Sequence, residues 1–195
     1  MRTQSQKQII AAARKLFATR GYYRCKVADI AREAGMSTGN IYWYYEGKEE
    51  ILRAILANGF ESHEAVLRDA AAHPGTTEER VDFLVDQYLD FLREQQDFFS
   101  ILIAILGHSG TPYLEELGFD MRDIEATYHR HLSRIIVQGQ KEGTIIKHSP
   151  DALAMLFFSL FNGMLLTYGE ELHALPDDVV RSAIHRLMGI MGSSP

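Results

Sequence analysis

Cysteine is almost absent from this chain, and long hydrophobic runs are few. The single cysteine, Cys25, excludes an intrachain disulfide, and no Cys/His spacing in the sequence would build a zinc site. Residues 1–19 lack the apolar core and cleavage site of a signal peptide, so we expect a reducing, cytoplasmic setting. The most apolar stretch, residues 152–166, is shorter than the roughly 20 residues that span a bilayer. It also contains Ser159, Asn162 and Gly163, and it is predicted to be a buried helix of a protein that does not enter the membrane.

Enzyme motifs are missing as well. The sequence has no glycine-rich phosphate loop, no nucleophile elbow and no carboxylate pair at a convincing spacing, so we expect neither an enzyme nor a cofactor. His129 and His131 are two residues apart, and on a helix such side chains point about 200° away from each other. They cannot share one ion, and no metal site is expected.

Charge is unevenly distributed along the chain. The formal net charge is −6, which by itself argues against a nucleic-acid partner. Residues 1–48, however, hold nine Lys and Arg against three Asp and Glu, a net of +6, so the remainder carries −12. A basic front on an acidic body is the asymmetry expected when one part of a protein meets a polyanion such as double-stranded DNA.

Helical periodicity dominates the rest of the pattern. No stretch shows the period-two alternation of strands or an Asn-Gly hairpin turn. Apolar spacing and capping residues predict about nine helices in an all-α fold, with a loop at residues 107–112. The expected helices are 5–20, 26–34, 38–45, 48–72, 76–92, 98–106, one ending near 143, one from 150 and one from 176. The first three form a compact three-helix head.

The segment from Val27 to Leu52 has the pattern of a helix-turn-helix, because Gly35 separates two short helical patterns. On the second of these, Ile41 and Tyr45 lie four residues apart and are predicted to point inward. The side chains left for the opposite face carry hydroxyl, amide and aromatic groups: Thr38, Asn40, Tyr42, Trp43 and Tyr44. Such groups suit a helix that reads base edges and binds phosphates in the major groove.

Individual residues on this face suit particular contacts. Asn40 can make a bidentate contact to adenine, and Thr38 can meet a thymine methyl group or a phosphate. Gly39 lets the backbone approach a phosphate near the helix N-terminus. The tyrosine hydroxyls suit phosphate oxygens, which fix the position on DNA but not the sequence.

The run DIAREAGMSTGNIYWYYEGKEEIL, with FATRGY before it, resembles the DNA-binding signature of the tetracycline-repressor (TetR) family. The resemblance covers about residues 8–56. It implies an all-α homodimer with a helix-turn-helix domain at residues 1–47. Residues 48–195 would then form a larger domain that binds a small effector and dimerises through its last two helices. By position, the DNA contacts of the family fall on Thr38, Gly39, Asn40, Tyr42, Trp43, Tyr44 and Lys48, with Lys48 on the DNA backbone.

Three departures from the family pattern involve four positions. The family commonly has Thr or Ser where Cys25 and Lys26 stand, and Lys26 could replace the hydroxyl contact to phosphate electrostatically. Gly47 stands where Ser or Asn is frequent, which as a helix cap costs only a few tenths of a kcal/mol. Tyr45 replaces the usual Phe, so its hydroxyl must reach the edge of the core.

Aromatic side chains are frequent after residue 56, and most of them must belong to the core. By family position, an effector cavity would involve Tyr88, Phe91, Phe99, Ile103, Tyr128, Phe158 and Asn162. Such a cavity suits a small, mostly apolar effector with one or two polar anchors. The amide of Asn162 needs a partner, and an effector, a backbone carbonyl or a water molecule could each serve.

The last two helical patterns, residues 150–169 and 176–191, hold more apolar residues than one small core needs. They predict a two-fold four-helix interface, and hence a homodimer on a pseudo-palindromic operator. The resemblance then implies a ligand-responsive regulator that is released from DNA by its effector, with repression as the commoner mode of the family. The alternative is a DNA-binding protein of the same fold that a protein partner controls, with no small-molecule effector.

Overall fold

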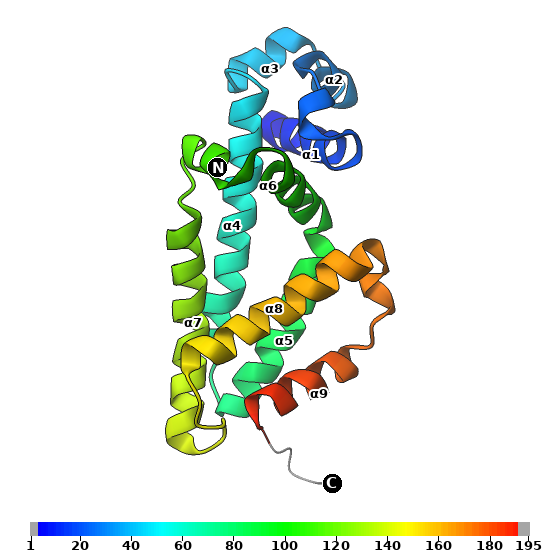
Figure 1. The fold of residues 1–195 in the computed structure, drawn as a ribbon. Coiled ribbons are helices and arrows are strands. Elements are labelled where there is room, and N and C mark those ends of the chain that lie inside the picture. Colours follow the sequence, from blue (N-terminus) through cyan, green and yellow to red (C-terminus); the bar gives the residue numbers. More distant parts are fainter. Residues whose placement is uncertain (1–3, 191–195) are drawn as a thin grey trace. The chain divides into compact units, whose positions relative to one another are not determined.

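The computed structural model describes residues 4–190, and within this range the fold is all-α, with no strand (Figure 1). Nine α-helices and two 3-10 helices are present in the described part, which agrees with the predicted fold class. In order they are α1 (Gln4–Arg20), η1 (Tyr22–Arg24), α2 (Val27–Glu33), α3 (Thr38–Tyr44), α4 (Lys48–Ala72), α5 (Thr77–Glu94), α6 (Gln96–Glu116), α7 (Met121–Glu142), α8 (Pro150–Tyr168), η2 (Gly169–Ala174) and α9 (Asp177–Met188).

The chain divides into two compact units. The head unit comprises residues up to 61 together with residues 95–121, and the body unit comprises residues 62–94 and those from 122 onward. The long helix α4 therefore contributes to both units, and α6 is grouped with the N-terminal helices. The predicted boundary between residues 47 and 48 separates a DNA-binding domain from a domain for effector binding and dimerisation. It stays a prediction.

In the head unit, α1 packs against α2 and α6, and α2 packs against α3. Their contact is apolar, since Ile9, Phe17, Ile30 and Ile41 are all at most 1% exposed. Gly35 adopts a φ of 67°, the left-handed conformation that closes a helix. This turn aims α3 away from α2, as the helix-turn-helix pattern predicts.

The predicted loop at residues 107–112 is wrong. Helix α6 continues to Glu116 and contains a kink, because Gly110 has non-helical angles (φ 69°, ψ −172°) that an L-residue with a side chain adopts only with strain. Pro112 follows the break at once, where the missing backbone N–H costs no intrahelical hydrogen bond. Gly110 and Pro112 therefore divide α6 into two helical segments that meet at a kink.

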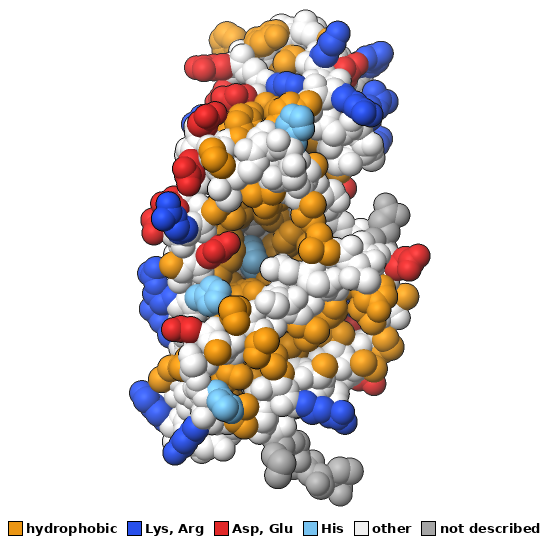
Figure 2. Space-filling view, in the orientation of Figure 1, with side chains coloured by type: hydrophobic (Ala, Val, Ile, Leu, Met, Phe, Trp, Pro, Cys, Tyr) orange, Lys and Arg blue, Asp and Glu red, His pale blue; other side chains and the backbone are white. Residues whose placement is uncertain are grey.

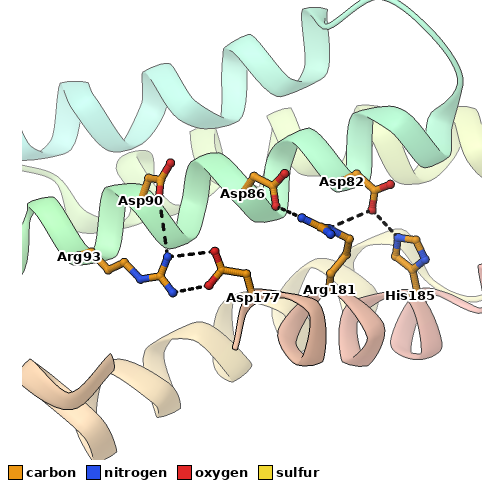
Figure 3. A network of polar contacts seen from close by, with 7 residues as sticks. All are labelled: Asp82, Asp86, Asp90, Arg93, Asp177, Arg181 and His185. Carbon is orange, nitrogen blue, oxygen red and sulfur yellow. Dashed lines mark hydrogen bonds and ion pairs between the residues drawn. The ribbon is translucent and has the colours of Figure 1, made fainter. Parts of the chain in front are cut away.

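In the body unit, α5 and α8 each pack against α9. A ladder of charged side chains joins α5 to α9 (Figure 3). Its contacts are Arg93 with Asp177, Arg181 with Asp86 and Asp82, and His185 with Asp82. The hydrogen bond from Arg93 lowers the pKa of Asp177. Because each partner sits on a successive helical turn, the ladder fixes the register of α9 against α5.

Helix α8 carries apolar side chains on its exposed face as well as on its buried face. Leu153, Phe157 and Phe161 are buried, whereas Met155 and Leu166 are 55% and 67% exposed. By length and composition, α8 is the one helix in the described residues that could cross a bilayer, and a third of it is buried in the protein. The prediction of a buried helix is therefore correct for one face only.

Candidate functional site

Helix α3 presents a polar and aromatic face on the head unit. Ile41 and Tyr45 are 0% and 6% exposed, as their spacing predicts. The Ser37 hydroxyl accepts a hydrogen bond from the backbone N–H of Asn40 at 3.2 Å and so begins the helix. Trp43 and Tyr42 are 83% and 58% exposed. Thr38, Gly39 and Asn40 are also exposed, and Tyr44 is half-buried.

Large aromatic side chains rarely stay exposed without a function. Trp43 and Tyr42 lie beside an amide and a hydroxyl on the same short helix. This combination matches the needs of major-groove recognition, in which flat, donor and acceptor groups must all face outward.

Basic side chains are frequent in the segments that precede this helix, α1 to α2. Figure 2 shows Lys and Arg along one edge of the part of the head unit that holds α1 to α3. The exposed Lys and Arg side chains in the described part of α1 to α3 are Lys7, Lys15, Arg20, Arg24, Lys26 and Arg32. Phosphate contacts of this kind supply affinity and fix the position of a protein on DNA.

The start of α2 shows what replaces the usual hydroxyl cap. The carboxylate of Asp29 accepts a hydrogen bond from the backbone N–H of Lys26 at 3.1 Å, but Lys26 has no acceptor to return one. Its side chain is exposed. Cys25 is 2% exposed, and burial raises the pKa of its thiol, so the thiol is held in its unreactive form.

Lys48 has a structural role that the sequence did not indicate. Its ammonium group donates hydrogen bonds to the backbone carbonyls of Tyr22, Tyr23 and Cys25, at 3.1, 3.5 and 3.2 Å. It also lies 4.4 Å from the centroid of the Tyr22 ring. All three N–H donors of Lys48 therefore have partners that hold η1 against the start of α4. A phosphate contact by Lys48 stays a prediction, and it would have to share these donors.

The body unit contains a buried cluster of aromatic side chains around His63 of α4. The rings of Tyr128, Phe91, Tyr88 and Phe158 lie 4.1, 5.0, 5.2 and 6.3 Å from the His63 ring, measured between centroids. The structure thus brings together four of the residues predicted to line an effector cavity. We call these five residues the aromatic cluster.

A polar pair lies inside the aromatic cluster. The Nε2 atom of His63 is 2.6 Å from the hydroxyl oxygen of Tyr88. Burial lowers the pKa of His63 to about 3 and raises that of Tyr88, so both side chains are neutral near pH 7. Sequence reasoning missed His63. Its signal was a polar residue among the apolar positions Phe60 and Leu67 of α4, which share its face.

The remaining predicted effector residues lie elsewhere. Asn162 is on the exposed face of α8 with Leu166, not among the buried aromatic side chains. Phe99 and Ile103 belong to the head unit, where Phe99 is buried beside the Phe98 ring and Ile103 is 40% exposed.

The head unit therefore has the architecture of a helix-turn-helix DNA-binding domain. Residues 9–55 match the family model described as "Bacterial regulatory proteins, tetR family". Residues 9–55 are therefore similar to the DNA-binding domain of transcriptional regulators of the TetR family. The family and the relatives described below are regulators and not enzymes, in agreement with the sequence-based expectation.

Similarity to known proteins is strongest in the head. The chain is 49% identical over 57 residues to the transcriptional regulator HbdR of Aromatoleum sp. (strain CIB), which covers 29% of this chain and 25% of HbdR. The chain thus aligns with only about a quarter of the length of that relative. It is 25% identical over 138 residues to the fatty acid metabolism regulator protein of Bacillus subtilis (strain 168), covering 71% of this chain and 69% of that protein.

The whole fold has a solved counterpart. The structure of the fatty acid degradation regulator FadR from Bacillus halodurans superposes with a TM-score of 0.77 and 20% identity. The superposition covers 99% of this chain and 98% of FadR. At this identity the likeness establishes the fold alone.

Proposed function

We propose that this protein is a cytoplasmic transcriptional repressor that binds a pseudo-palindromic DNA operator as a homodimer and leaves it when a small, mostly apolar effector binds. The observation that carries the proposal is the exposed face of α3, where Asn40, Tyr42 and Trp43 point outward while Ile41 anchors the helix in the core. Repression is the commoner mode of the family and is adopted on that ground.

The dimer is supported by the exposed face of the last helices. Figure 2 shows hydrophobic side chains gathered over α8 and α9. Met155, Leu156 and Leu166 of α8 and Val179 of α9 are between 46% and 67% exposed. A contiguous apolar surface of this kind on a soluble protein favours association with another surface. A two-fold dimer would present two α3 helices to half-sites roughly 34 Å apart.

The aromatic cluster supports an apolar effector. Its walls are the rings of Phe91, Tyr128 and Phe158, and it contains the polar pair of His63 and Tyr88. A ligand that lies among these side chains would gain from apolar burial and from one hydrogen bond. The names of two similar proteins, both regulators of fatty acid metabolism or degradation, make fatty acids and their acyl derivatives the first compounds to test.

Selection from a randomised DNA library tests the DNA-binding proposal. We expect the protein to enrich a pseudo-palindrome, and the Asn40→Ala variant to lose discrimination of about 1–3 kcal/mol at one base pair of each half-site. Gln8→Ala, which removes an exposed amide from α1, is the matched control and should leave the preference unchanged. Enrichment of no sequence, or full specificity in Asn40→Ala, would contradict the assignment of this face.

A thermal-shift screen tests the effector. A ligand present at 100 times its dissociation constant should add roughly 2.7 kcal/mol to the free energy of unfolding. The same ligand should release the protein from the selected operator, because it can act only by binding one state more tightly. A complete lack of response to apolar ligands would favour control by a protein partner instead.

A further inference from the structure

A shallow basic groove runs along α7 in the body unit. Its volume is about 910 Å³, and it is lined by Arg130, Arg134 and Lys141, with Asp151 as the one carboxylate among the lining residues. Within residues 4–190, Arg134 and Lys141 form no ion pair. The hydroxyl oxygen of Ser133, which also lines the groove, is buried and has no hydrogen-bond partner. The groove therefore offers positive charge and an unused polar group to a negatively charged occupant.

The groove lies beside the N-terminal end of α8, since Asp151 belongs to the first turn of that helix. From this end, one stripe of α8 is exposed along its whole length. The stripe consists of Ala152, Met155, Leu156, Ser159, Asn162, Gly163 and Leu166. No atom comes within 4 Å of the position that a Cβ would take at Gly163, so this residue leaves a gap in the surface.

The exposed stripe is self-complementary in size about Ser159. In a two-fold dimer each residue i that meets j is matched by j meeting i. If the axis crosses α8 at Ser159, Met155 of one copy lies opposite the gap at Gly163 of the other. The same operation places Leu166 opposite Ala152. In these two pairs a large side chain meets a small one, as close packing requires, while Leu156 lies opposite Asn162.

An axis that crosses α8 makes the two copies of this helix antiparallel, and the charges at its two ends are opposite. Arg134, Lys141 and Lys147 lie near its N-terminal end and are exposed. Glu171 and Asp178, which follow its C-terminal end, are exposed as well. Antiparallel helices therefore bring the acidic end of one copy to the basic end of the other, whereas parallel helices would bring like charges together.

We infer that the basic groove of α7 holds the acidic segment that follows α8 in a second copy of the chain, with the two α8 helices antiparallel about Ser159. The inference rests on the proposed homodimer. It adds the register of the two α8 helices and a second contact, between the groove of α7 and the segment after α8. Apolar packing of the α8 stripes supplies most of the affinity. The pairing of the groove with Glu171 fixes the orientation, because exposed charge pairs contribute to specificity more than to affinity.

A charge-swap experiment tests this contact, with the dimer dissociation constant measured by sedimentation at about 50 mM salt, where screening is weak. Arg134→Glu and Glu171→Arg should each raise the constant about five- to tenfold, because each turns an attraction into a repulsion at both symmetric contacts. The double variant should restore it to within about twofold of the parent value. These differences should nearly vanish at about 0.5 M salt.

Four further substitutions make the outcome decisive. Arg68→Glu, at an exposed arginine of α4 outside the groove, should leave the constant unchanged. Gly163→Met should weaken the dimer at every salt concentration by filling the gap, and Met155→Ala should partly restore it. Arg134→Gln should have the same circular dichroism spectrum as the parent protein. This result would show that a weaker dimer does not come from loss of the fold.

The two proposals fail in different ways. A parent protein that is monomeric at micromolar concentration overturns the homodimer itself. A dimer that Gly163→Met weakens, but that neither charge reversal affects, leaves the homodimer standing and overturns the groove contact. Stabilisation by inorganic phosphate that is lost in Arg134→Glu, with an unchanged dimer constant, would show that the groove binds a free anion instead.

Discussion

Buried His63 makes the stability of this protein depend on pH between about pH 7.5 and pH 5. Burial lowers the pKa of His63 from 6.5 to about 3. The unfolded chain therefore binds a proton below pH 6.5 that the folded chain does not bind until about pH 3. The free energy of unfolding is unaffected by His63 above pH 7 and falls as the pH drops below 6.5. Between pH 7.5 and pH 5 the loss is about 2 kcal/mol.

Urea unfolding at fixed protein concentration, followed by circular dichroism from pH 7.5 to pH 5, measures this loss. His63→Gln keeps a polar group near the Tyr88 hydroxyl and cannot titrate, so its pH dependence should be flatter than that of the parent by about 2 kcal/mol. The carboxylate of Asp177, whose pKa is lowered, loses its contribution only below about pH 4. His148→Gln, at an exposed histidine, is the control. Parallel pH curves for the parent and His63→Gln would refute the reasoning.

Three other outcomes follow from single contacts. Gly59→Ala should destabilise the protein in a thermal unfolding assay although alanine favours helices, because the new Cβ would lie 2.1 Å from the Phe98 ring. At Gly107 a Cβ would have open space, so Gly107→Ala should be neutral or stabilising in the same assay. Lys48→Ala should lower the free energy of unfolding by about 1–3 kcal/mol, because three backbone carbonyls lose their donor; an unchanged stability would restrict Lys48 to DNA contact. The Cys25 thiol should react with a thiol reagent only at the rate of unfolding, and fast modification of the native protein would contradict its burial.

Local signals explain why the helices were predictable. A helix was expected from residue 150, and the Ser149 hydroxyl before it accepts a hydrogen bond from the backbone N–H of Ala152. A helix was also expected from residue 76, where Thr76 and Glu79 have the spacing of a capping box and form both reciprocal hydrogen bonds. Gly110 and Pro112 both disfavour a continuous helix, and a loop was therefore predicted there. The structure has a kink at Gly110 instead, with a helical segment on each side.

The recognition face of α3 was also readable from the sequence, because helical spacing alone divides Ile41 and Tyr45 from the residues around them. The partners of long side chains were not. Lys48 finds its carbonyls more than twenty residues away, in η1. His63 gains its ring neighbours from α5, α7 and α8.

The sequence by itself determined the all-α class, the helix-turn-helix and the side chains that α3 turns outward, since each follows from spacing within a few turns of the chain. The tertiary structure alone decided three other features. They are the neutral state of His63, the use of Lys48 as a clamp on η1, and the exposure of one apolar face of α8. Each of these depends on which distant segments pack around a residue, and burial of that kind is a property of the folded chain rather than of any local pattern.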